Sequence, residues 1–186
     1  MRIETQRRAT AEDALNLHRR TGVRYEVVEG EPRQLPPTGG EHGGIETWVT
    51  FLLQRHVIDH PIGRVFVGEV LCRLKRDPDT ARAADVAFMR KERLPNGQLP
   101  VGPVEGAPDL VVEIVSLSDT AGEIQEKISQ WLAGGATVVW ALYPGTRGVV
   151  VWRATGASPE LHQDAEVDAE PVLPGFRCRA ADLFGD

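Results

Sequence analysis

The sequence predicts a mixed α/β domain in which one central β-sheet is flanked by helices. Stretches with apolar residues at helical spacing are interleaved with shorter, β-branched apolar stretches that are typical of strands. The chain has 186 residues with 41% hydrophobic content, which is enough to fill one core but leaves little room for a second. We therefore expect a single domain over residues 1–186, with its core between about residues 10 and 184.

The N-terminal half is expected to hold two helices and two pairs of strands. Thr10 can cap a helix whose first turn contains Glu12 and Asp13, where the positive end of the helix favours acidic residues. The second helix carries apolar residues at steps of three and four, the spacing of one buried face. In chain order the elements are a helix from Thr10 to about Arg20, strands at 25–28 and 33–35, a helix from Glu41 to about His60, and strands at 64–74 and 83–89.

The C-terminal half is expected to contain a long loop and then strands around one helix. Residues 91–108 are rich in proline and glycine and lack a period, and loops of this length more often serve a function. Thr120 and Glu123 form a capping box, and Gly134-Gly135 ends the helix that they begin. The remaining predicted elements are strands at 109–115, 137–142 and 148–152 and a short turn at 180–184.

Composition limits the classes of function. The formal net charge of -6 is unlike that of a dedicated nucleic-acid coating protein, although a local basic channel on an acidic body stays open. Cys72 and Cys178 are isolated, so they predict neither a zinc ribbon nor a redox pair, and two reduced thiols are favoured over a disulfide. No segment approaches the roughly 20 apolar residues that span a bilayer, so we expect a cytoplasmic protein without a membrane partner.

Glu113 is the most informative residue of the chain. It lies in the middle of Asp109-Leu110-Val111-Val112-Glu113-Ile114-Val115, the most apolar run in the sequence. Burying an unpaired carboxylate in such a strand costs several kcal/mol. A cationic partner is therefore expected, which could be an arginine, a lysine or a metal ion.

Two further ionisable residues interrupt apolar elements. Asp85 lies inside the strand at 83–89, and Lys127 lies at the edge of the core stripe of the helix, about 40° from Trp131 at the usual helical pitch. A helix that folds back over the sheet after the Glu113 strand would bring Lys127 near Glu113, with Asp85 on a neighbouring strand.

Such a group could perform phosphodiester chemistry. Two carboxylates on adjacent strands suit Mg²⁺ or Mn²⁺, which lowers the pKa of a bound water, and a nearby ammonium offsets the charge that develops on a phosphate. The alternative is a buried ion pair that only stabilises the fold. The spacing of the residues alone gives these two interpretations about equal weight.

The local sequence adds a family resemblance. Several segments, in this order and over nearly the whole chain, resemble the Uma-two family of restriction endonucleases, which is assigned to the PD-(D/E)-x-K nuclease superfamily. The segments are Tyr25-Glu26-Val27-Val28-Glu29-Gly30-Glu31, His42, Ala84-Asp85-Val86-Ala87-Phe88, residues 107–116 around Glu113, Glu126-Lys127 and Leu173-Pro174-Gly175-Phe176.

The resemblance implies a restriction-endonuclease-like fold and a metal site formed by Asp85 and Glu113. The usual superfamily pattern has a lysine two residues after the glutamate, where this chain has Val115. The resemblance therefore implies a migrated lysine, supplied by Lys127. Two departures affect loops rather than ligands: Leu117 replaces a usual proline, and residues 141–144 lack an aspartate often found before the proline.

Three residues are secondary candidates. The resemblance marks His42 as a possible accessory residue, although a histidine at a helix start more often packs against a loop than takes part in catalysis. Glu31 is a possible third metal ligand, because an early acidic residue can complete the metal site in this superfamily. Glu46, one helical turn after His42, competes for that role.

The leading hypothesis is a Mg²⁺-dependent endonuclease in which Asp85 and Glu113 bind the metal, Lys127 stabilises the transition state and water attacks. Its expected substrate is DNA, with RNA as a further possibility. A homodimer is expected by analogy with enzymes that cut two strands. The alternatives are a catalytically inactive nuclease fold that binds nucleic acid or acts as an adaptor, and a metal-independent hydrolase such as a glycosidase with two carboxylates.

Overall fold

The computed structural model describes residues 8–116 and 118–185, and Leu117 therefore lies outside the described residues. Its helices are α1 (Ala11–Thr21), α2 (Gly40–Asp59) and α3 (Ala121–Ala133), with 3-10 turns η1 (Lys91–Arg93), η2 (Pro95–Gly97) and η3 (Ala181–Phe184). Its strands are β1 (Tyr25–Val28), β2 (Glu31–Gln34), β3 (Gly63–Lys75), β4 (Thr80–Arg90), β5 (Val104–Glu105), β6 (Leu110–Ile114), β7 (Val138–Tyr143), β8 (Gly148–Arg153), β9 (Gly156–Ala157), β10 (Leu161–His162), β11 (Glu166–Asp168) and β12 (Arg177–Arg179).

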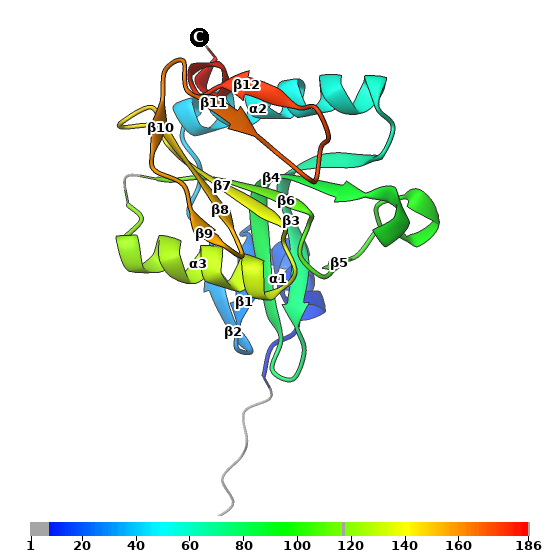
Figure 1. Cartoon of the computed structure of the whole chain (residues 1–186). Coiled ribbons are helices and arrows are strands. Elements are labelled where there is room, and N and C mark those ends of the chain that lie inside the picture. Colours follow the sequence, from blue (N-terminus) through cyan, green and yellow to red (C-terminus); the bar gives the residue numbers. More distant parts are fainter. Residues whose placement is uncertain (1–7, 117, 186) are drawn as a thin grey trace, which may run out of the picture.

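The large sheet lies between α2 on one face and α3 on the other (Figure 1). Its strands follow the order β10-β8-β7-β6-β4-β1-β2, with β3 paired to β4. The pair β6–β7 is parallel, whereas β4–β6 and β7–β8 are antiparallel. This arrangement confirms the predicted central mixed sheet flanked by helices.

Alternation along β6 decides which helix each residue meets. Val112 packs in the core beneath α2, whereas Val111 packs with Trp131 of α3 on the opposite face. Because successive side chains of a strand point to opposite faces, Glu113 shares the α3 face with Val111. The strand therefore directs its carboxylate towards the helix that carries Lys127.

Two strands pair with the same edge of β4, and the part of that edge between them has no strand partner in the described part of the chain. β3 pairs along nearly the whole length of β4 and so occupies the other edge. On the shared edge, β1 pairs at Ala81, whereas β6 pairs from Val86 to Phe88. Residues 82–85 lie between these two pairings. This gap between β1 and β6, which we call the β4 gap, positions the candidate site.

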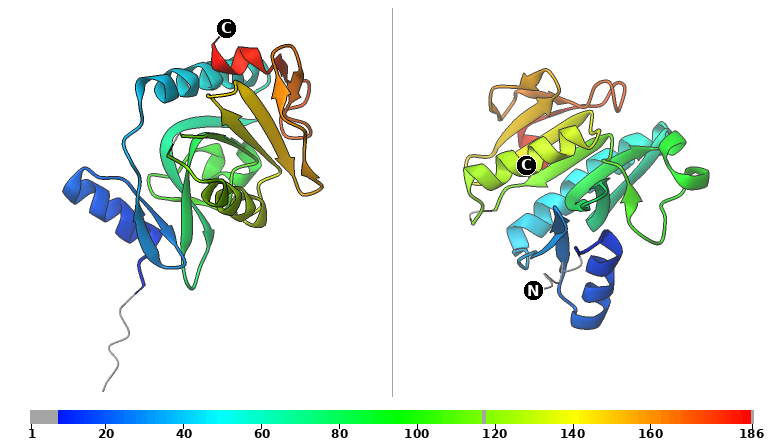
Figure 2. Two further views of the ribbon diagram at one scale, coloured as in Figure 1. Left: turned by 90° about the vertical axis from the view of Figure 1, so that its left-hand side faces the viewer. Right: turned by 90° about the horizontal axis from the view of Figure 1, so that it is seen from below.

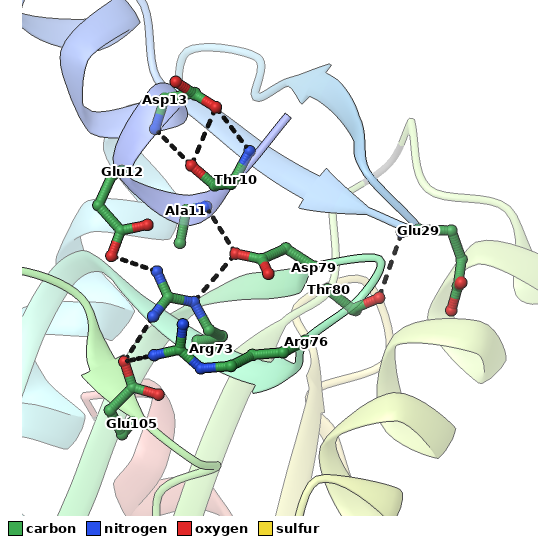
Figure 3. Close-up of polar contacts among 10 residues, drawn as sticks. All are labelled: Thr10, Ala11, Glu12, Asp13, Glu29, Arg73, Arg76, Asp79, Thr80 and Glu105. Carbon is green, nitrogen blue, oxygen red and sulfur yellow. Dashed lines mark hydrogen bonds and ion pairs between the residues drawn. The ribbon is translucent and has the colours of Figure 1, made fainter. Parts of the chain in front are cut away.

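The helix α1 and the β1–β2 hairpin lie together at one end of the molecule (Figure 2). A buried arginine, Arg73 of β3, fixes this end to the sheet. Its guanidinium makes ion pairs with Glu12 of α1, with Asp79 at 3.0 Å and with Glu105 of β5 at 2.6 Å, as Figure 3 shows. Asp79 also accepts a hydrogen bond from the Ala11 N–H, so the first turn of α1 is joined to the β3–β4 turn.

Most predicted elements occur within two residues of their expected ends. The differences are short strands: the loop at 91–108 contains β5, which pairs with β3, and the C-terminal segment forms the small β11–β12 sheet. Strands of two or three residues carry no readable period. Cys72 and Cys178 are free thiols, as favoured. Within the described ranges, no helix is both long and apolar enough to cross a membrane.

Candidate active site

A cavity of about 530 Å³ opens at the β4 gap. The β1–β2 hairpin, the loop before α2, the strands β4 and β6 and the helix α3 all contribute to its wall. The ionisable residues discussed below are prominent in its lining: Glu26, Arg33, His42, Arg82, Asp85, Glu113, Glu126 and Lys127. The fold therefore brings Asp85, Glu113, Lys127 and His42 to one place.

Glu113 is held by two residues of α3. The indole Nε1 of Trp131 donates a hydrogen bond to Oε1 at 2.6 Å, and Nζ of Lys127 lies 2.7 Å from Oε2. Burial raises the pKa of Glu113 to about 8, because the loss of hydration and the nearby charge of Asp85 outweigh the attraction of Lys127. The carboxyl group is thus poised to ionise near neutral pH.

Lys127 lies between two carboxylates. Besides Glu113, its Nζ lies 3.6 Å from Oε1 of Glu26. Burial alone would lower the pKa of Lys127, but the negative charges of Glu113 and Glu26 raise it above that of a free lysine. The side chain therefore carries a positive charge at neutral pH.

Asp85 lies one residue beyond the last β4–β6 pair. Its Oδ2 accepts a hydrogen bond from the backbone N–H of Ile114 at 2.6 Å, in place of a ladder bond. Its Oδ1 lies 3.3 Å from Nε2 of His42, at the start of α2. This contact with Asp85 raises the pKa of His42, so the imidazole favours its charged form beside the carboxylate.

Glu26 is a site residue that the sequence reasoning missed. Its Oε1 accepts a hydrogen bond from the Ala83 N–H at 2.9 Å, and its Oε2 lies 2.7 Å from Nη1 of Arg82. Burial would raise the pKa of Glu26, but Lys127 and Arg82 together lower it. The signal was available, because Glu26 interrupts the short apolar strand β1 much as Glu113 interrupts β6.

The two candidates for a third metal ligand lie in different surroundings. Glu31 is exposed at the start of β2, opposite Val28, and is not among the residues that line the cavity. Glu46 directs Oε1 to the N–H of Gly68 at 3.2 Å. Burial and the charge of Asp85 raise the pKa of Glu46.

Asp85 and Glu113 are two carboxylates of the cavity wall that could hold a divalent ion. Among the described residues, no group of three or more His, Cys, Asp or Glu side chains is arranged to bind a metal. Mg²⁺, however, is commonly held by one or two carboxylates, with water and substrate phosphate as its other ligands. Asp85 accepts a hydrogen bond from the N–H of Ile114, the residue that follows Glu113, so the two carboxylates are neighbours on adjacent strands. The donor set therefore fits a two-carboxylate Mg²⁺ or Mn²⁺ site.

The raised pKa of Glu113 leads to a prediction about stability. Between about pH 4.5 and pH 8 the unfolded chain has released this proton while the folded protein retains it, so raising the pH favours unfolding. We expect the melting temperature of the metal-free protein to fall over this range more steeply than that of Glu113→Gln, which lacks the group. Thermal unfolding at several pH values checks this, and parallel curves for the two proteins would contradict it.

Comparison with known proteins identifies a family and a similar fold. Residues 11–181 match the family model Uma2, described as "Putative restriction endonuclease". The fold matches the crystal structure of "a putative nuclease belonging to DUF820" from Anabaena variabilis, with a TM-score of 0.76, 24% sequence identity and coverage of 88% of this chain and 91% of that chain. Comparison with curated proteins finds no match.

Proposed function

The chain belongs to the Uma2 family, the family that its sequence motifs predicted, and we propose that it is a Mg²⁺- or Mn²⁺-dependent endonuclease that hydrolyses phosphodiester bonds in DNA. The observation that supports this proposal best is the Glu113–Lys127 contact of 2.7 Å in the wall of the cavity, with Asp85 on the adjacent strand. A carboxylate pair can hold the metal ion that activates water, and a lysine can stabilise the negative charge that develops on the phosphate.

In this proposal Asp85 and Glu113 hold the divalent ion. When bound, the ion would lower the pKa of the attacking water and place positive charge beside the scissile phosphate. The Ile114 N–H bond to Asp85 and the Trp131 N–H bond to Glu113 keep the two carboxylates in place before substrate arrives. Nε2 of His42 lies 3.3 Å from the other oxygen of Asp85.

Lys127 would stabilise the transition state by its charge. Because Glu113 and Glu26 raise its pKa, Lys127 stays protonated and cannot accept a proton from water at neutral pH. Its ammonium group can instead donate hydrogen bonds to a phosphate oxygen as negative charge develops there. Glu26, neutralised by Arg82, keeps the lysine between the two carboxylates.

The proposed substrate is a nucleic-acid backbone. Arg33, at the rim of the cavity, is half exposed, and its guanidinium contacts Glu126 of α3 at 3.3 Å. Such an exposed pair is easily exchanged for a contact with a phosphate. The net charge of -6 implies that attraction of DNA is local to this rim rather than spread over the surface.

Cleavage of supercoiled plasmid in the presence of Mg²⁺ or Mn²⁺ tests the proposal. Lys127→Met is expected to lower the rate by about 100- to 1000-fold, because a preorganised positive charge at the phosphate is lost. Lys75→Met is the matched control, since Lys75 forms an exposed pair with Glu29 at 3.0 Å and lies outside the cavity lining. Equal rates for the two variants would reject a catalytic role for Lys127.

We propose further that two copies act together, since each chain supplies one candidate site and double-strand cleavage needs two cuts. Sedimentation equilibrium with and without DNA checks this. A monomer under both conditions that still linearises plasmid in one event would reject it.

A further inference from the structure

Trp131 and Lys127 approach the same carboxylate from one helix. They are four residues apart on α3, so their side chains lie on the same helical face. Trp131 donates to Oε1 of Glu113 and Lys127 contacts Oε2, so the two oxygens have different partners. A carboxylate held at both oxygens cannot turn about its terminal bond without losing one of these contacts.

The environment of its N–H distinguishes Trp131 from Trp140 and Trp152. Trp131 is fully buried, and its N–H meets a carboxylate at 2.6 Å. The N–H of Trp140 reaches only a backbone carbonyl, that of Asp168, at 3.3 Å. The buried Nε1 of Trp152 has no hydrogen-bond partner within the part of the chain that the structure describes. A tryptophan needed only for packing would not require a short hydrogen bond to a buried carboxyl group.

We propose that Trp131 is a positioning residue for the reaction: its indole N–H fixes Oε1 of Glu113 and thereby orients the carboxylate for its ionic partner. This inference rests on the proposed function. It assigns Trp131 no contact with the substrate. Hydrogen-bond donors behind a metal-binding side chain commonly change metal affinity or activity by about 10- to 100-fold when they are removed.

Three variants test the proposal by plasmid cleavage at varied Mn²⁺ concentration. Trp131→Phe removes the N–H but retains an aromatic ring, and we expect its cleavage rate at low Mn²⁺ to fall about 10- to 100-fold, with a higher Mn²⁺ requirement. Trp131→Tyr retains a donor and should recover part of the loss. Trp152→Phe removes an N–H that meets no partner in the described chain and should behave as the wild type.

A second measurement is independent of turnover. Each tryptophan gives one indole N–H signal in a proton–nitrogen correlation spectrum. The signal that is lost in Trp131→Phe is that of Trp131. Glu113→Gln is expected to shift the Trp131 signal, because the acceptor of its N–H changes from a carboxyl group to an amide, and to leave the Trp152 signal in place. An unmoved Trp131 signal would overturn the contact itself.

The outcomes separate the inference from the proposed function. If wild type cleaves DNA, Glu113→Gln does not, and Trp131→Phe cleaves like Trp152→Phe with the same Mn²⁺ requirement, the positioning role is rejected and the proposed function stands. A purely structural role of Trp131 would lower the melting temperature without changing the Mn²⁺ requirement, and this also rejects the inference. If the wild type does not cleave DNA at any Mn²⁺ concentration, both the proposed function and the positioning role of Trp131 are rejected.

Discussion

Glu113→Gln is expected to lower metal-dependent DNA cleavage by about a thousandfold or more while leaving the protein folded. The amide has nearly the shape of the carboxylate but cannot supply negative charge to a divalent ion. It also weakens the contact that holds Lys127, whose Nζ lies 2.7 Å from the carboxylate. Initial rates of plasmid nicking, measured beside the melting temperature, check both parts of this result.

The control for this variant is Glu29→Gln. Glu29 forms an exposed ion pair with Lys75, so the same chemical change is made at a surface ammonium–carboxylate pair away from the cavity. We expect wild-type cleavage from Glu29→Gln. Glu113→Gln should remain folded at pH 8, and its melting temperature should change less with pH than that of the wild type. Full cleavage activity in Glu113→Gln would reject the proposed metal site.

Arg73→Met is expected to lower the free energy of unfolding by about 3–5 kcal/mol without altering the cavity. The arginine is 3% exposed and joins α1, the β3–β4 turn and β5 through Glu12, Asp79 and Glu105. In the native protein Nε of Arg73 lies 3.0 Å from Oδ2 of Asp79, so the substitution leaves this buried carboxylate without its cationic partner. Urea denaturation followed by circular dichroism measures the loss.

Arg76→Met provides the comparison. Arg76 contacts the same Glu105 at 2.9 Å, but its side chain is 62% exposed. Exposed ion pairs contribute about 0–1 kcal/mol, so this variant should unfold almost as the wild type does. Similar losses of unfolding free energy in the two arginine variants would show that burial does not determine how much the Arg73 contacts stabilise the fold.

The main elements were predictable because their hydrophobic patterns extend over many residues and because capping or turn residues mark their ends. The capping boxes at Thr10 and Thr120 fix the starts of α1 and α3, and the apolar repeat fixes the buried face of α2. The short strands β5, β9, β10, β11 and β12 were missed. A strand of two or three residues forms because the tertiary fold places its backbone beside another strand. This contact between segments distant in the sequence leaves no pattern in the local sequence.

The candidate site was predictable in part for the same reason. Glu113 and Lys127 are separated by one strand-to-helix turn, so local geometry indicates that they meet. Glu26 meets them only because β1 returns to the edge of β4, a pairing that involves Val27 and Ala81. Of the acidic residues in the segment at 25–31, Glu31 was singled out from family analogy, but the tertiary pairing directs Glu26 to the cavity instead.

The β4 gap has a consequence for how the sheet and the site depend on each other. Between β1 and β6, side-chain oxygens occupy places that a neighbouring strand would fill: Glu26 accepts the Ala83 N–H, and Asp85 accepts the Ile114 N–H. These acidic residues are thus surrogate strand neighbours as well as members of the site. A sheet completed at this point by one more backbone ladder would close the cavity, so the interruption of its regular structure creates the opening of the candidate site.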